Sequence, residues 1–502
     1  MPLKRVESPL WRSAVRRGGL GLLIILALLI IGLVVNTLLV TVPPAHDVRA
    51  TDTPVLDDAA PRRLATAVTF PTVSSREPGM LDPAPFVALD AFLREAFPRV
   101  HEHLSRTDIG ELSHLYEWQG RDPELKPVLL MAHQDVVPAV DPESWRHPPF
   151  SGTIEDGFVW GRGAMDDKAA LMGCLEAIEE LLSSGFQPAR TVYLAFGHDE
   201  EVGGATGAYA ISQHLAARAV RLEFVLDEGG FIGHGLLPAI EAPIAFVGTA
   251  EKGYLTLELV AEEDGGHSSR PPAQTAIGIV SRAVAKLEDR PFPSRLNGAT
   301  EEMFEQLAPY MPFGQRLVIS NKWLLAPALL AMLESDATMA ALARTTTAAT
   351  MFEAGEQDNV LARQAKAVIN LRILPGESVD ATLERVRNVV DDPRVRVRNS
   401  FATEPSPTSS TTSAAYDLLA TSIREAIGGD VIVVPYLLLA GTDSRHFAPI
   451  SDDIYRFVGL SLTDEDIARY HGIDERISIR DYEKVVAVYY RLLRNLDDLA
   501  PQ

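Results

Sequence analysis

Cysteine is almost absent from this chain of 502 residues, since Cys174 is the only one. A single cysteine excludes an intrachain disulfide and a zinc site built from several thiolates. Any metal ion must therefore be held by carboxylates and imidazoles. Cys174 falls on the apolar side of a predicted helix, which favours a buried structural thiol over a catalytic nucleophile.

Basic residues are also in short supply. The chain has 46 Lys and Arg against 68 Asp and Glu, a formal net charge of -22. Phosphate binding needs clustered Lys and Arg, and such a cluster occurs only at the N-terminus, so we expect no nucleic-acid partner. The length allows two or three domains with substantial cores.

Charge is missing altogether from residues 18–42, which are mostly Leu, Ile and Val. At about 1.5 Å per residue this segment can cross a hydrocarbon core of roughly 30 Å. Five basic residues and one acid precede it in residues 1–17. The positive-inside rule then predicts a single-pass membrane anchor with a cytoplasmic tail and an extracytoplasmic remainder, whether periplasmic, luminal or extracellular. A cleaved signal peptide is the alternative, but the run is longer than a usual signal core and lacks a clear cleavage site. Residues 43–61, rich in Pro, Asp and Ala, are the predicted linker.

Residues 62–248 alternate strand-like and helical patterns. Strands are expected at 128–132, 191–197 and 224–226, with helices at 169–182 and 207–217. This alternation predicts an α/β domain with a mostly parallel, mixed sheet. The same character returns in residues 402–502, which we therefore assign to the same catalytic domain.

Residues 249–401 have a different pattern. Strands are predicted at 254–261, 345–352, 365–372 and 394–398, and helices at 273–288 and 379–390. The order βαββαβ predicts a ferredoxin-like lid domain that interrupts the catalytic domain. Residues 290–344 indicate a mainly helical insertion. Its apolar residues fit ordinary core, the lining of a substrate channel or a membrane-facing surface, and we favour core.

Polar side chains follow several of the predicted strands, where open α/β sheets place their sites. In His133 and Asp135, an imidazole can bind a metal ion while a carboxylate fixes its orientation. Glu200 and Glu201 are adjacent and point in different directions, so one can bind metal while the other stays free as a base. Three further residues are candidates. Asp166 is a carboxylate at the start of a predicted helix, Asp227 is a carboxylate at the end of a buried strand, and His471 is an imidazole in a loop near the C-terminus.

Each of these residues alone has a structural interpretation. Asp166 would be a carboxylate stabilised by a helix N-terminus, Glu200 and Glu201 a solvated acidic turn, and His471 a structural loop residue. Taken together, however, two imidazoles and three or four carboxylates without nearby basic residues suit a pair of zinc-like ions with one bridging carboxylate.

Six motifs in order resemble the co-catalytic zinc peptidases of the aminoacylase and carboxypeptidase type, peptidase family M20. The resemblance runs from about residue 62 to the C-terminus and is greatest to the membrane-anchored branch with carboxypeptidase S and the N-fatty-acyl-amino-acid synthase/hydrolases. The motifs begin at these residues: His133-Gln134-Asp135, Gly161-Arg162-Gly163, Asp199-Glu200-Glu201, Asp227-Glu228-Gly229, Gly266-His267-Ser268 and Gly441-Thr442-Asp443.

The resemblance implies two Zn²⁺ ions per subunit, replaceable by Co²⁺ or Mn²⁺. It implies that His133 and Asp227 bind one ion, that Glu201 and His471 bind the other, and that Asp166 bridges both. It further implies that Asp135 orients His133, that Glu200 is the general base, and that the peptide bond between Asp166 and Asp167 is cis.

The resemblance also assigns roles to residues outside this group. His267 would stabilise the oxyanion, and in dimeric members it comes from the opposite subunit, which would make a homodimer through the lid domain. The residues implied for substrate binding are Asn359, Arg372, Arg445 and His446.

The expected activity is metal-assisted hydrolysis of the amide bond of small peptides or N-acyl amino acids that carry a free carboxylate. The same reaction can run in reverse, as condensation of an acid with an amino acid to form the amide. The sequence leaves a carboxypeptidase and a fatty-acyl amino acid hydrolase both open, although the apolar insertion mildly favours a long acyl group. A different class of function, an inactive membrane-tethered binding protein on the same fold, is the alternative. The presence of Glu200 argues against it.

Overall fold

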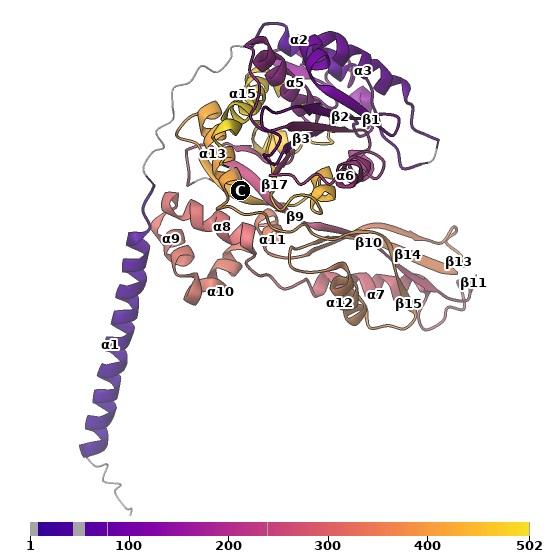
Figure 1. Cartoon of the computed structure of the whole chain (residues 1–502). Coiled ribbons are helices and arrows are strands. Elements are labelled where there is room, and N and C mark those ends of the chain that lie inside the picture. The colour runs from indigo at the N-terminus through magenta and orange to yellow at the C-terminus, as the bar shows by residue number, and fades with distance from the viewer. Residues whose placement is uncertain (1–8, 44–55, 78, 238, 501–502) are drawn as a thin grey trace, which may run out of the picture.

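The computed structural model describes residues 9–43, 56–77, 79–237 and 239–500 (Figure 1). A single long helix, α1 (Pro9–Leu39), projects from the body of the molecule, and its stretch Leu20–Leu39 is long and apolar enough to cross a membrane. The helix starts inside the segment predicted as a tail, whose residues 1–8 lie outside the described residues, as does most of the predicted linker. Arg and Ala are good helix formers, so helix can extend beyond the apolar run.

The catalytic domain is built on a mixed sheet, as predicted. Its ten strands run in the order β1-β2-β6-β3-β7-β17-β9-β8-β18, and β16 also pairs with β9. The pairs of β3 with β6 and β7, of β17 with β7, of β16 with β9 and of β18 with β8 are parallel. The bounds are β1 Ser105–Ile109, β2 Ser113–Trp118, β3 Val128–His133, β6 Val192–Gly197, β7 Val225–Asp227, β8 Phe231–Gly233, β9 Ile244–Glu251, β16 Ile432–Leu438, β17 Ile454–Arg456 and β18 Ser461–Leu462.

Helices cover both faces of this sheet because the central strands are apolar on both sides. Along β3, Leu130 packs with the core that contains α5 and α15, whereas Leu129 packs with the core that contains α6. Gly173 lets α5 and α15 approach closely, since a Cβ there would lie 2.6 Å from Val485. The helices are α2 Ala60–Val68, α3 Ala84–Ala96, α4 Pro98–His103, α5 Lys168–Ser183, α6 Ala208–Ala217, α13 Ala414–Ile427, α14 Asp464–Ile467 and α15 Ile479–Asn495. A small sheet joins β4 Thr153–Glu155, β5 Phe158–Trp160 and β19 Arg476–Ser478.

The lid domain is the predicted βαββαβ unit. Its antiparallel sheet has the order β12-β14-β10-β15, and α7 and α12 cover the face that buries alternate residues of β10. A short pair, β11 with β13, extends the lid at the end away from the catalytic domain (Figure 1). The bounds are β10 Gly253–Glu262, β11 Gly266–His267, α7 Ala276–Asp289, β12 Thr346–Ala354, β13 Val360–Leu361, β14 Gln364–Ile373, α12 Val379–Val390 and β15 Val395–Thr403.

The interval predicted as a helical insertion contains α8 Gly298–Leu307, α9 Phe313–Ser320, α10 Lys322–Leu333 and α11 Ala337–Ala343. Its buried residues, among them Phe304 and Leu307, pack with Val434 and Leu437 of β16. The insertion therefore belongs structurally to the catalytic domain, although its sequence lies within the lid. The favoured interpretation of its apolar residues as core holds for α8 but not for one face of α10, which is exposed.

Candidate functional site

The candidate site lies at the carboxyl ends of three neighbouring strands. His133 is the last residue of β3, Glu200 and Glu201 follow β6, and Glu228 follows β7. Because β3 lies between β6 and β7 and is parallel to both, these side chains converge at one edge of the sheet.

Asp166 lies between two imidazoles. Its Oδ1 is 3.0 Å from His133 Nε2, and its Oδ2 is 3.1 Å from His471 Nε2. It sits in the loop before α5, buried, and the peptide bond that follows it is cis, as predicted. One carboxylate with an imidazole at each oxygen is the arrangement needed to bridge two metal ions.

Two groups of ligand atoms surround Asp166 in the described part of the chain. One consists of His133, Asp166 and Glu201, the other of His133, Glu200 and Glu228, and in each the atoms lie within 4.8 Å of one another. His471 Nε2 is also 3.1 Å from Glu201 Oε2, and His133 Nε2 is 3.5 Å from Glu228 Oε1.

Asp227, which the resemblance implies as a metal ligand, lies apart from both groups of ligand atoms. Its Oδ2 accepts a hydrogen bond from the backbone N–H of Ser444 at 2.8 Å. Neighbouring residues at a strand end point to opposite sides, so Glu228 takes the place beside His133 that we expected of Asp227. The adjacent acids in the motif were the signal for Glu228, which the sequence analysis missed.

Electrostatics favour a cation here. Burial and then the charge of Asp166 raise the pKa of Glu228 to about 8, and burial and then Asp443 raise the pKa of Glu200 well above its usual range. Burial also acts to raise the pKa of Asp166, but hydrogen bonds from the two imidazoles outweigh it and lower that pKa. Crowded buried carboxylates of this kind are stabilised by a divalent ion.

The donor set fits such ions. Glu201 Oε1 is buried and has no hydrogen-bond partner among the described residues, although the other oxygen of the same carboxylate faces His471. A buried carboxylate oxygen without a hydrogen-bond partner destabilises the folded protein unless a ligand such as a metal ion binds to it. Two imidazoles with carboxylates suit zinc or a similar divalent metal.

Asp135 supports the site chiefly through the backbone. Its Oδ1 and Oδ2 accept the N–H groups of Glu200 and Glu201, each at 3.1 Å. His133 Nδ1 lies 2.9 Å from the Asp135 carbonyl oxygen and 3.4 Å from its Oδ1. Asp135 is thus placed to orient both the imidazole and the two glutamates.

Glu475 holds the loop that carries Asp166, a role the sequence analysis did not predict. Its Oε1 accepts the backbone N–H groups of Met165 and Asp166 at 2.8 and 3.2 Å. Its Oε2 accepts hydrogen bonds from Arg162 Nη1 at 2.6 Å and from the N–H of Gly163 at 3.1 Å. The buried pair therefore fixes the position of Asp166.

Arg372 lies on β14 of the lid, on the sheet face opposite the one that α7 and α12 cover. Its guanidinium is 4.3 Å from the centre of the Tyr254 ring, and that ring packs edge-on against Phe401. A side chain at Gly203, beside the two glutamates, would come within 3.9 Å of Phe401. Among the described residues no carboxylate acts on the pKa of Arg372, which burial lowers, so its planar fork can accept a carboxylate partner.

Arg445 and His446 lie against the same loop. Arg445 Nη2 donates to the Gly203 carbonyl at 2.8 Å, and His446 Nε2 is 3.2 Å from that oxygen. Burial and the neighbouring Arg445 lower the pKa of His446 to about 4, so it is neutral near pH 7.

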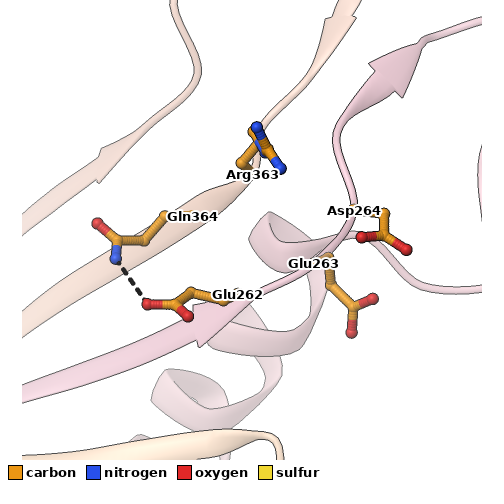
Figure 2. A pocket seen from close by; sticks show the side chains of 5 residues that line it. All are labelled: Glu262, Glu263, Asp264, Arg363 and Gln364. Carbon is orange, nitrogen blue, oxygen red and sulfur yellow. Dashed lines mark hydrogen bonds between the residues drawn. The ribbon is translucent and has the colours of Figure 1, made fainter.

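His267 and Asn359 are not brought to the site in this chain. Both are exposed at the outer end of the lid, where Ser268 donates to the Asn359 carbonyl at 3.1 Å (Figure 1). A surface hollow at that end of the lid is also separate from the site (Figure 2). It is lined by Glu262, Glu263, Asp264, Arg363 and Gln364.

Comparison with known proteins identifies the family. Residues 129–495 match the family described as "Peptidase family M20/M25/M40". The chain belongs to this family. It is 42% identical over 441 residues to "Probable carboxypeptidase S-like 2" of Dictyostelium discoideum, covering 87% of this chain and 85% of that protein. It is likewise 42% identical over 440 residues to "N-fatty-acyl-amino acid synthase/hydrolase PM20D1" of Mus musculus, covering 86% of this chain and 87% of that protein.

Two solved structures share the fold of this chain. The M20 family metallo-carboxypeptidase Sso-CP2 from Sulfolobus solfataricus superposes with a TM-score of 0.65 at 20% identity, over 88% of this chain and 100% of that one. Human carnosine dipeptidase 1 gives 0.64 at 14% identity, over 88% and 96%. The protein is therefore a hydrolase of the M20 peptidase family, whose members depend on metal.

Proposed function

We propose that this protein is a membrane-anchored dinuclear zinc hydrolase that cleaves the amide bond of small peptides or N-acyl amino acids with a free carboxylate. The observation that carries this proposal is the position of Asp166, with an imidazole at each carboxylate oxygen. A structural carboxylate needs no such symmetrical pair, whereas a metal bridge does.

The proposed ligands follow from the geometry. His133 and Glu228 would hold one ion, Glu201 and His471 the other, and Asp166 would bridge them. When bound, the ions would polarise the amide carbonyl and lower the pKa of a bound water. Zn²⁺ is the proposed ion, with Co²⁺ or Mn²⁺ as substitutes.

Glu200 is the proposed general base. Its carboxylate lies with His133 and Glu228, and Asp135 holds its backbone. Glu200 would accept a proton from the attacking water and deliver it to the leaving nitrogen of the amide. A raised pKa suits this transfer, because the base must both accept and release a proton near neutral pH.

The substrate carboxylate would bind to Arg372. The guanidinium is held against Tyr254 on the lid, so its planar fork is already oriented. The names of the mouse relative and of carboxypeptidase S from Saccharomyces cerevisiae, 31% identical over 501 residues, both indicate substrates that contain an amino acid. Asn359 and His267 would join the site only from a second copy, in a homodimer through the lid, while Arg445 and His446 would support the substrate-binding loop.

The anchor would remain attached to the enzyme. Leu33 and Thr37 of α1 hydrogen-bond to Asn321 in the helical insertion, so the end of the apolar helix is part of the folded structure. This contact favours an uncleaved anchor over a removed signal peptide. With the basic tail cytoplasmic, the catalytic domain would be extracytoplasmic.

The test uses full-length protein in detergent, supplied with Zn²⁺. Elemental analysis should find about two zinc ions per chain, and a chelator should stop release of the amino acid from its amide. A dipeptide and a long-chain N-acyl amino acid are assayed in parallel, and the preferred one identifies the acyl side of the substrate. Protein that takes up zinc but cleaves neither would refute the proposed substrate class, and protein that binds no zinc would favour the binding-protein alternative.

A further inference from the structure

The apolar helix α1 is joined to the helical insertion by a group of polar contacts near its C-terminal end. Asn36 Nδ2 donates to the Ser320 carbonyl at 2.7 Å and to Asn321 Oδ1 at 3.1 Å. Asn321 Nδ2 donates to the Leu33 carbonyl and to Thr37 Oγ1, each at 3.1 Å. Thr37 and Asn321 are fully buried. We call this group the Asn36–Asn321 contact.

This contact lies at membrane depth if α1 spans the bilayer. The stretch Leu20–Leu39 has 20 residues, about 30 Å of helix, and Leu33 is about 9 Å before its end. Asn36 and Thr37 are the only side chains of that stretch with hydrogen-bonding groups. Polar groups in hydrocarbon need partners within the protein, and the insertion provides partners for both.

Helix α10 follows the contact directly and exposes an apolar face. Its exposed positions recur at helical spacing and carry no charge: Trp323, Leu324, Pro327, Ala328 and Ala331. We call these residues the α10 apolar face. Trp323 is 69% exposed and Leu324 42%, while Phe313 at the start of α9 adds a ring that is 44% exposed. Such a cluster on a soluble surface marks an interaction site.

The charged residue that begins α10 is paired with carboxylates of another helix. Lys322, at the first position of α10, forms ion pairs with Glu301 and Glu305 of α8. Figure 1 shows α9 and α10 alongside the upper part of α1, with the catalytic domain beyond them. A tryptophan on an apolar helix beside a spanning helix is typical of the membrane interface.

We propose that the α10 apolar face and Phe313 insert into the lipid leaflet at the C-terminal end of α1. The partner is the bilayer itself. The proposal rests on the membrane anchor proposed above, because the Asn36–Asn321 contact fixes α10 at the depth of that helix. The protein is then attached by two elements, one that crosses the bilayer and one that lies in a single leaflet, and its catalytic domain cannot turn freely about the anchor.

The test places an environment-sensitive fluorophore on single cysteines in the full-length protein, reconstituted into phosphatidylcholine vesicles that contain nitroxide-labelled lipid. The probe positions are Trp323→Cys and, as a second position on the same face, Ala331→Cys. Ile30→Cys in α1 reports on the anchor, and Val140→Cys, on the catalytic domain and 63% exposed, is the solvent control. Cys174 is buried and is replaced by Ala in all variants.

The nitroxide lipid should reduce fluorescence at Trp323 and Ala331 by a fraction comparable to that at Ile30, with no loss at Val140. Quenching at Ile30 alone would overturn the proposal and leave the anchor intact. Quenching at neither α1 nor α10 would refute the anchor and this proposal together. Protection of Trp323 from lipid that depends on protein concentration would assign the face to a second copy instead.

Discussion

The carboxylate of Asp135 accepts the backbone N–H of Glu200 at 3.1 Å, and its second oxygen does the same for Glu201. One buried side chain thus sets the position of the proposed base and of a proposed metal ligand. The two adjacent side chains join different groups of ligand atoms, Glu200 with Glu228 and Glu201 with Asp166, which is why we propose different roles for them.

The first prediction concerns Glu200. Glu200→Gln keeps the shape of the side chain but removes the group that accepts the proton, so we expect kcat to fall by about 10²- to 10⁴-fold. Zinc content should stay at the wild-type level, since Glu200 is not one of the proposed ligands. Turnover and elemental analysis on the same preparation check both statements, and a variant with near-normal kcat would refute the role.

The second prediction separates Glu228 from Asp227. Glu228→Gln should lose one of two zinc ions and most activity, because its oxygen faces His133. Asp227→Asn should keep both ions, since an amide oxygen can still accept the N–H of Ser444 and burial already raises the pKa of Asp227. Zinc per chain is measured for both variants. The reverse result would restore Asp227 as the ligand.

The third prediction concerns the substrate carboxylate. Arg372→Gln should raise KM by roughly 10- to 100-fold, as expected for a charged hydrogen bond worth about 1.5–3 kcal/mol. Arg372→Lys should recover only part of this loss, because a lysine lacks the planar fork. Steady-state kinetics with a substrate and its carboxamide analogue provide the check. If the wild-type enzyme treats both alike, Arg372 does not bind the carboxylate.

The fourth prediction concerns pH and Lys252, which is buried where the lid meets the catalytic domain and donates to the Arg344 carbonyl at 2.7 Å. Burial and then the charge of Arg372 lower the pKa of Lys252 to about 7. Between that value and its ordinary pKa the unfolded chain holds a proton that the folded protein lacks, so this residue makes stability rise with pH.

For a single group that slope approaches about 1.4 kcal/mol per pH unit. Lys252→Met should therefore flatten the pH dependence of the free energy of unfolding above pH 7. Urea unfolding at several pH values measures it. An unchanged slope in the variant would show that Lys252 is already charged in the folded protein.

Much of the fold was predictable because its periodicity is strong. Leu255, Leu257 and Leu259 alternate with polar residues, which predicted a lid strand, and the structure buries all three. The apolar run before His133 predicted the central strand β3. The candidate metal ligands at strand ends were predictable for a related reason, since parallel strands deliver their ends to one edge of the sheet.

Other features depend on information that sequence patterns do not contain. The choice between Asp227 and Glu228 depends on which way the chain leaves β7, and the hydrogen bond to Ser444 comes from 217 residues further along. The exposed face of α10 is as apolar as a buried helix, so its exposure can be seen only in the folded structure. His267 lies at the outer end of the lid, and its proposed role requires a second copy, which a pattern in one chain does not reveal. Glu475 accepts hydrogen bonds from the backbone of a distant loop, and such contacts leave no pattern in the sequence.

The helical insertion belongs to the lid by sequence but packs on β16 of the catalytic domain. Any swing of the lid sheet would therefore leave α8, α9 and α10 in place. The insertion is joined to α1 through the Asn36–Asn321 contact, whereas Arg372 lies on β14 of the lid sheet. In the proposed membrane-bound enzyme, a lid movement that admits substrate would therefore leave the lipid-contacting helices in place.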